Sequence, residues 1–444
     1  MDPANVCALA LEIGGDDLAD VYAEQTHRTE ITATDAETTA TTVRISSGLG
    51  IRVSGAHGLG FAFASSPSRA QIAGSVQAAR DAAALATSAL PRPAHLVSAP
   101  RPIVALDRPA VRKQQTEKRR ELARTMYRIA ADRSHGIIVR RCIVGDESTH
   151  IAVAAKHSAH VVHEFRRTSS WCAVSVLASD SGGTAQSGEA FRFGREHAEL
   201  DVNDCAHEAQ AKACALVGAQ TPPAGDQPVV LSPPAAAALA ALIGDALSGS
   251  ALASGRSPFT RRSGSRVAPE CVSLSDDGRW PSGMKTAPFD GEGVPTQRTA
   301  LINEGVVVGA LHSLETAATS AAESTGNALR SSYRTPPTAA PSNIFLEPHQ
   351  STLAEMLNAA DGGIYIQRLF ARRLAATGGG RFGFGAAGWR IARGELGQPL
   401  TGITIGGEIL DVLSQIERVG RDFQFSGSRG APTIGVASAA IGGR

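Results

Sequence analysis

The chain has 444 residues, which is enough for two to four domains of about 150 residues each and for a sizeable core. Its 43 basic and 42 acidic residues nearly cancel, so the net charge gives no reason to expect binding to nucleic acid. The start of the chain lacks a basic flank before an apolar run, and no stretch reaches the roughly 18 apolar residues of a membrane span. We therefore expect a soluble, cytoplasmic protein without membrane contact.

Six cysteines are scattered along the chain without C-x-x-C spacing. This arrangement favours neither a disulfide framework nor a structural zinc site. We expect reduced, mostly buried thiols at Cys7, Cys142, Cys172, Cys205, Cys214 and Cys271.

Residues 1–90 predict an N-terminal α/β domain. Apolar side chains at helical spacing indicate a helix at Asn5–Ile13, and alternation indicates a strand at Ala19–Thr34. A hairpin is expected from Val43–Val53 and Gly58–Ala64, followed by an Ala-rich helix at Ala70–Ala86. The glycines of this hairpin lack the spacing of a nucleotide-binding loop, so no phosphate site is expected at Gly48, Gly50, Gly58 and Gly60.

A middle α/β domain is predicted at residues 111–220. Five prolines between Ser88 and Ala110 mark a stiff, extended linker before it. The domain opens with a charged amphipathic helix at Arg112–Asp132 and closes with a helix at Asp201–Val217. Between them the pattern predicts a strand meander at Gly136–Val144, Ile151–Ala155, His157–Phe165 and Ser170–Ser179.

A β-rich C-terminal domain is predicted at residues 227–444, after a second proline-rich break. It opens with a strand at Pro228–Leu231 and a helix at Pro234–Ala253. Further on, Asn303-Glu304-Gly305 indicates a tight turn between two strands. The segment Thr325–Asn343 has little periodicity, which is typical of a long functional loop. The predicted fold class is thus α+β, with N-terminal α/β domains followed by a β-rich domain whose strands are connected by long loops.

Several phrases in the second half resemble the C-terminal domain of the TldD/PmbA, or modulator-of-gyrase, metallopeptidase family. They are DGEGVPTQRT at 290–299, STGN at 324–327, PSNIFLEP at 341–348, GITIGGEIL at 402–410, VGRD at 419–422 and GAPTI at 430–434. A looser match is VRISSGLGIRV at 43–53. In this family two related subunits pair: TldD carries a zinc ion, and PmbA, also called TldE, carries none.

The resemblance also defines where a zinc site would lie. TldD-type subunits carry His-Glu-x-x-x-His on a helix and a cysteine near the C-terminus, so that two imidazoles and a thiolate hold zinc while the glutamate can deprotonate a bound water. The equivalent helix here, Pro234–Ala253, contains no histidine, and the stretch Gly427–Pro432 contains no cysteine. The resemblance therefore implies a PmbA/TldE-like subunit with no cofactor of its own and zinc on its partner.

Other catalytic arrangements find little support in the sequence. His163-Glu164 begins like the zinc motif but ends in Thr168, and His207-Glu208 has Lys212 at the corresponding position. No serine has the G-x-S-x-G context of a nucleophile elbow. Alternation along a strand would separate the nearby histidines, so we expect surface or hairpin histidines, with an independent metal site as the alternative, at His150, His157, His160 and His163. No catalytic residue is assigned to this chain.

Polar and aromatic side chains concentrate in the loops between residues 290 and 343. Either they satisfy a complicated turn region, or they line the inner wall of a cleft shared with a TldD-type partner, where a peptide or small amide substrate would lie over the partner's zinc. These candidate substrate-cleft or interface residues are Asp290, Glu292, Thr296, Arg298, His312, Asn327, Arg330, Tyr333, Arg334, Ser342 and Asn343.

The function that the resemblance implies is that of a zinc-free subunit in a heterodimeric metallopeptidase. Its partner would hydrolyse short or unfolded peptides, and this chain alone would be inactive. The segment Gly378–Gly385 replaces a more polar stretch of the family, which leaves open a specialised pair that cleaves an amide bond in a natural-product intermediate. The alternative is a non-catalytic, homodimeric binding or regulatory protein.

Overall fold

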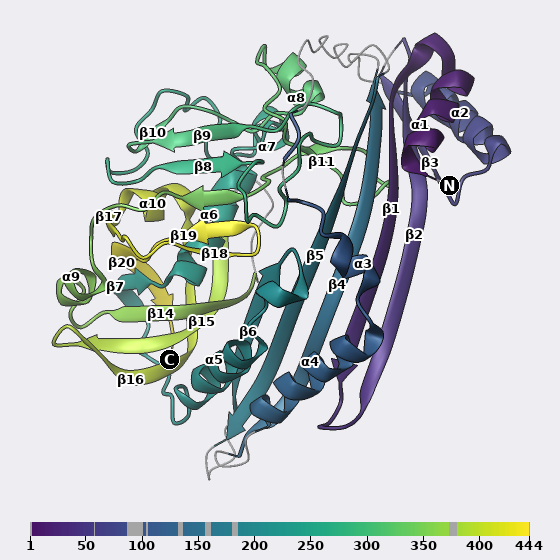
Figure 1. Cartoon of the computed structure of the whole chain (residues 1–444). Coiled ribbons are helices and arrows are strands. Elements are labelled where there is room, and N and C mark those ends of the chain that lie inside the picture. The colour runs from purple at the N-terminus through teal and green to yellow at the C-terminus, as the bar shows by residue number, and fades with distance from the viewer. Residues whose placement is uncertain are drawn as a thin grey trace.

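The structure is a computed structural model that describes residues 2–56, 58–86, 101–103, 105–131, 136–155, 161–179, 185–372 and 380–443. Figure 1 shows a long sheet with helices along one face, and beside it a C-terminal part built on two further sheets. This arrangement confirms the predicted α+β class. His157, His160 and most of the predicted linker lie outside the described residues.

Six antiparallel strands form the long sheet in the order β3-β2-β1-β4-β5-β6. Their bounds are β1 Leu18–Ala33, β2 Thr39–Ser54, β3 Leu59–Ser65, β4 Ile138–Ala155, β5 Val162–Ser179 and β6 Ala185–Gly194. Because β1 pairs with β4 from Asp20↔Ala155 to Thr32↔Ile143, the strands predicted for the N-terminal and middle domains share one sheet. The predicted boundary between those two domains therefore lies between strands of one sheet.

The predicted meander of short strands is wrong in its number of strands. The single strand β4 joins most of the predicted strand Gly136–Val144 to Ile151–Ala155, and β5 is likewise continuous from Val162 to Ser179. The polar run Asp146–Thr149 interrupts the apolar pattern of β4, but its backbone stays paired with β1 and β5 on both sides. Long-range pairing therefore overrides the local signal.

Helices cover one face of this sheet in two groups (Figure 1). At one end, α1 (Pro3–Gly14) and α2 (Arg69–Ala84) pack on buried side chains that include Leu49 and Ile51. At the other end, α4 (Thr116–Ala130) and α5 (Val202–Cys214) pack on a second core that includes Val174. The predicted helix Arg112–Asp132 is divided, because Gln114 and Gln115 are extended between α3 (Pro109–Lys113) and α4.

The C-terminal part contains two six-stranded sheets around one core. The first sheet has the order β10-β9-β8-β13-β19-β18, and its strands are β8 Leu274–Asp277, β9 Arg298–Asn303, β10 Val306–Val307, β13 Ile344–Leu346, β18 Gln424–Ser426 and β19 Arg429–Ala431. The second has the order β16-β15-β14-β7-β20-β17, and its strands are β7 Gly225–Leu231, β14 Ile364–Arg372, β15 Arg381–Ala392, β16 Glu395–Glu408, β17 Ile416–Val419 and β20 Ile434–Gly442. Short elements complete it: β11 Ala328–Leu329, β12 Thr338–Ala339, α8 Leu314–Thr319, α9 Leu353–Ala359 and α10 Ile409–Ser414.

The helix α6 (Pro233–Ala246) contacts strands of both sheets and contributes most of its length to their common core. The predicted helix Pro234–Ala253 is divided into α6 and α7 (Gly249–Ala253), because Ser248 accepts a hydrogen bond from the Ala251 N–H and starts a new helix. The predicted turn at residues 303–305 is confirmed. Glu304 and Gly305 have φ angles of 47° and 79°, as a tight hairpin between β9 and β10 requires.

None of the helices in the described ranges is long and apolar enough to cross a membrane. All six cysteines are free thiols, and four of them are buried, as predicted.

Candidate functional site

A cleft of about 1040 Å³ separates one end of the long sheet from the C-terminal part. On one side it is lined by β4, β5, β6 and α5, and on the other by Pro234 of α6, Ser282, the strand β18 and Gly427 in the turn after it. Two of these lining residues lie in the segments where the family resemblance predicts zinc ligands. Pro234 lies in the first turn of α6, and Gly427 begins the stretch where the family's cysteine was expected.

The residues on this side of the cleft do not fit a zinc ion. The sequence of α6 is PPAAAALAALIGDA, so that Asp245 is its single ionisable residue. The stretch 427–432 contains no cysteine or histidine. An imidazole or thiolate ligand is therefore missing at both positions where the family resemblance would place one.

The charged groups on the opposite wall are largely paired. Arg192 on β6 donates to the carboxylates of Asp204 and Glu208, and Lys212 also pairs with Glu208. Burial pulls the pKa of Glu208 upward, but the hydrogen bonds from Lys212 and Arg192 outweigh it and lower that pKa. Glu208 is thus held ionised and neutralised, which makes it a poor general base.

Several of the predicted site residues lie instead at the junction between the long sheet and the C-terminal part. Arg52 of β2 donates to Asp20 of β1 at 2.7 Å and to the Glu292 carboxylate at 2.7 Å. Arg330 reaches the same aspartate at 2.8 Å and also donates to the Gly291 carbonyl oxygen. The side chains of these four charged residues are at most 4% exposed. Two carboxylates and two guanidinium groups therefore balance each other's charge inside the protein, and they connect the long sheet to the C-terminal part.

Asp290 supports the same junction from within its own loop. Its carboxylate accepts hydrogen bonds from the backbone N–H groups of Glu292, Val294 and Ala328. Burial and the neighbouring charge of Glu292 raise the pKa of Asp290 to about 8, against the pull of these three donors. The Asp290 side chain therefore fixes the backbone of its own loop and connects it to Ala328.

Tyr333 docks the long C-terminal loop onto β2. A Cβ atom on Gly48 would overlap the Tyr333 ring, and one on Gly50 would lie 2.5 Å from the Tyr333 carbonyl oxygen. The Tyr333 hydroxyl lies 2.9 Å from the Ser65 hydroxyl, and the exposed Arg334 guanidinium donates to it. These glycines, which the sequence did not assign a role, therefore provide space for Tyr333.

Another group surrounds Asp276 of β8, a fully buried residue that the sequence analysis did not single out. The Asp276 Oδ2 atom accepts hydrogen bonds from Asn327 and Ser342, each at 2.6 Å. Asn343 donates to the Asp277 carbonyl oxygen and accepts from the Lys285 N–H. These polar side chains hold the loop against β8.

The remaining predicted residues lie apart from one another. Thr296 donates to the Ala287 carbonyl oxygen, and Arg298 pairs with Glu347 on the surface at 2.6 Å. His312 is buried, with Nδ1 3.3 Å from the Thr316 hydroxyl, and burial lowers the pKa of His312.

The structure thus divides the eleven predicted residues among several places, and none of them is among the described residues that line the cleft. Most are buried and bonded within this chain, which agrees with the turn-region interpretation; contact with a partner or substrate stays a prediction. Sequence reasoning missed Arg52 and Asp20. The signal for them is a charge in the middle of an apolar strand, as in GLGIRV and LADVY.

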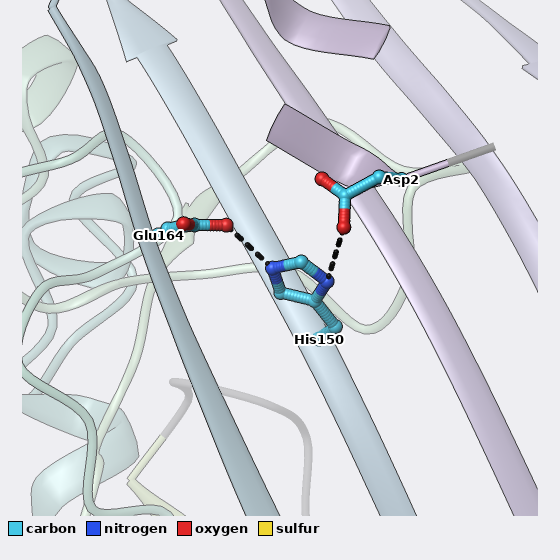
Figure 2. A group of neighbouring side chains, drawn as sticks. All are labelled: Asp2, His150 and Glu164. Carbon is cyan, nitrogen blue, oxygen red and sulfur yellow. Dashed lines mark hydrogen bonds and ion pairs between the residues drawn. The ribbon is translucent and has the colours of Figure 1, made fainter. Parts of the chain in front are cut away.

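Among the described residues, one group of three has the spacing of potential metal ligands: Asp2, His150 and Glu164. Figure 2 shows the His150 ring between the two carboxylates, with Nε2 2.7 Å from Glu164 and Nδ1 3.5 Å from Asp2. Each ring nitrogen faces a different carboxylate, and the Arg166 guanidinium lies 3.4 Å from Asp2. The His150 ring thus lies between the N-cap residue of α1 and a side chain of β5.

Among the described histidines, His163 and His207 do not add to this group. His150 belongs to the face that α1 covers, whereas His163 contacts the Phe289 ring on the opposite face at 6.0 Å between centroids. His163-Glu164 lies on a strand, and His207-Glu208 lies on α5 with Lys212 paired to the glutamate. Neither motif has the helical pair of histidines that the family's zinc site requires.

Two stretches of the sequence match known protein domains. Residues 224–443 match the PmbA/TldA metallopeptidase C-terminal domain, and residues 19–86 match PmbA/TldA metallopeptidase domain 1. A metalloprotease of Methanocaldococcus jannaschii is 32% identical over 236 residues, which are 53% of this chain and 52% of that protein. A TldD homologue of Buchnera aphidicola, named a metalloprotease, is 30% identical over 210 residues, which are 47% and 43% of the two chains. The chain spans about half the length of the curated relatives that it matches.

Solved structures show the same fold over nearly the whole chain. TldE from Thermococcus kodakarensis has a TM-score of 0.83 at 19% identity and covers 99% of both chains. A Thermotoga maritima protein described as a modulator of a DNA gyrase has a TM-score of 0.84 at 21% identity, covering 99% of this chain and 98% of that one. These structures share the fold, and the two matched domains show that the chain belongs to the PmbA/TldD family of metallopeptidase-type proteins.

Proposed function

We propose that this chain is the zinc-free, TldE-like subunit of a two-subunit metallopeptidase. It completes the substrate cleft and stabilises a TldD-like partner, which supplies the zinc ion and the general base. The substrate is a short or unfolded peptide, or an amide bond in a natural-product intermediate.

One observation carries this proposal. Pro234 of α6 and Gly427 border the 1040 Å³ cleft, at the two places where the family resemblance would put zinc ligands, yet α6 has no histidine and residues 427–432 have no cysteine. This chain has the family's fold and a cleft beside these positions, but it has no metal ligands there. Such a subunit fits a role in substrate binding. The likeness in fold to the TldE of Thermococcus kodakarensis supports the same assignment.

The test is to co-express this chain with the TldD-like protein of the same genome and to purify the complex through a tag on this chain. Mass measurement and metal analysis should give a heterodimer with about one zinc ion per pair. Replacement of the partner's motif histidines should remove the zinc but leave the pair assembled. Peptidase activity should require both subunits.

A metal-free homodimer that ignores the TldD-like protein would contradict the proposal. That result would favour a homodimeric binding or regulatory protein. Stoichiometric zinc on this chain alone would also contradict it. The variant His150→Ala would then show whether the ion is bound by Asp2, His150 and Glu164 (Figure 2).

A further inference from the structure

The cleft has an uneven distribution of charge on its walls. Four basic side chains line it against two acidic ones, namely Arg140, Arg141, Arg192 and Lys212 against Glu189 and Glu208. Arg192 and Lys212 are both bound to Glu208, and Arg192 also to Asp204. Of the remaining charges, Arg140 and Arg141 outnumber Glu189, so these two arginines provide the excess of positive charge.

These two arginines are neighbours in sequence on β4, yet both line the cleft. In a regular strand, successive side chains point to opposite faces. The pairing of β4 with β5 shifts register between Val139 and Arg141, and such a bulge re-aims side chains locally. Both arginines are exposed, and neither has a carboxylate partner among the described residues.

An apolar surface lies beside this basic pair. Phe191 on β6 is 40% exposed, and Phe193 and Phe425 line the same cleft. Three carbonyl oxygens of β6, those of residues 187, 189 and 191, already accept hydrogen bonds from Arg368, Lys212 and Arg192. The side chains of the cleft are therefore the groups considered for ligand binding.

We infer that the cleft selects peptide segments that carry carboxylate side chains next to an apolar residue. Arg140 and Arg141 would pair with the carboxylates, since guanidinium groups bind them through paired hydrogen bonds, and Phe191 would contact the apolar residue. A peptide is chosen over nucleic acid because the proposed function is that of a peptidase subunit and because the 43 basic and 42 acidic residues of the chain nearly cancel. This inference rests on the proposed function, which makes the cleft a substrate site, and it adds the chemical class of the substrate.

The test measures binding by fluorescence anisotropy, with the full chain alone and with its complex with the TldD-like protein. The probe is a fluorescein-labelled, glutamate-rich, unstructured peptide with a central leucine. The control peptide, called the lysine twin, has the same sequence with lysine in place of every glutamate. The glutamate peptide should bind in preference. Arg140→Gln/Arg141→Gln should weaken that binding about fivefold or more at low salt, as expected for the loss of two partly exposed ion pairs. Raising the salt to about 0.5 M should remove most of the difference.

The matched control is Arg418→Gln/Arg421→Gln, which removes two exposed arginines that lie near Glu355, outside the cleft. It should leave the affinity unchanged. Equal binding of the lysine twin, or an unchanged affinity of the Arg140/Arg141 variant, would overturn the inference. Tighter, arginine-dependent binding of a single-stranded oligonucleotide would overturn it in favour of nucleic acid.

The two proposals fail separately in this design. A zinc-containing pair that binds or cleaves both peptides equally would keep the proposed function and reject the acidic specificity. Arginine-dependent binding of the glutamate peptide to a chain that forms no such pair would keep the specificity of the cleft and reject the peptidase role.

Discussion

At the scale of single residues, Asp276 is the carboxyl group whose environment has the clearest consequence for stability. It is fully buried, its Oδ1 atom has no hydrogen-bond partner, and burial raises the pKa of Asp276 to about 6 in spite of the hydrogen bonds from Ser342 and Asn327. In the unfolded chain an aspartate has a pKa of about 3.9. The folded state therefore holds this proton more tightly, and the stabilisation is greatest below about pH 4 and is lost as the pH rises through about 6.

Asp276→Asn removes this titration while preserving the shape of the side chain. From about pH 4 to about pH 7, the free energy of unfolding of the wild type should fall by about 2 to 3 kcal/mol relative to the variant. Chemical denaturation at a series of pH values measures this difference. The prediction is wrong if the stability of the wild type relative to the variant stays constant with pH or increases as the pH rises. Either result would mean that burial does not raise the pKa of Asp276.

At the scale of elements, α2 lies on β3 at a position where only glycine fits. A Cβ atom on Gly60 would overlap the Ala79 carbonyl oxygen and crowd the backbone of Ala83, both in α2. Gly60→Ala should therefore displace the helix and lower the free energy of unfolding by about 1 to 3 kcal/mol. Gly74→Ala is the matched control, because Gly74 lies on the exposed face of α2 with no atom near the added methyl group. It should stabilise the protein by up to about 1 kcal/mol, and equal effects of the two substitutions would contradict this packing.

At the scale of the whole molecule, the buried charges between the long sheet and the C-terminal part join the two. Glu292→Gln leaves Arg52 without one of its two carboxylate partners, and the removal of one member of a buried ion pair costs about 3 kcal/mol or more. Urea denaturation should show this loss. Glu408→Gln is the control, because its pair with Arg381 is exposed and should contribute less than about 1 kcal/mol. A Glu292 variant as stable as the control would mean that the network does not hold the two parts together.

The sequence by itself determined the local elements and the family. Helical spacing placed α1 and α2, the Asn303-Glu304-Gly305 turn placed the β9–β10 hairpin, and the phrases around residues 290–348 indicated the family that the comparisons confirm. These signals depend on residues that are close together in the chain, so a pattern can be recognised without knowledge of the fold.

Only the tertiary structure decided how distant segments meet. Arg52 binds carboxylates 32 and 240 residues away, and the cleft combines Arg141 of β4 with Gly427 near the end of the chain. The strands of the two predicted N-terminal domains become one sheet because β1 pairs with β4, on the far side of the predicted linker. Such contacts are selected by burial and by long-range backbone pairing, for which the local spacing of residues carries no signal.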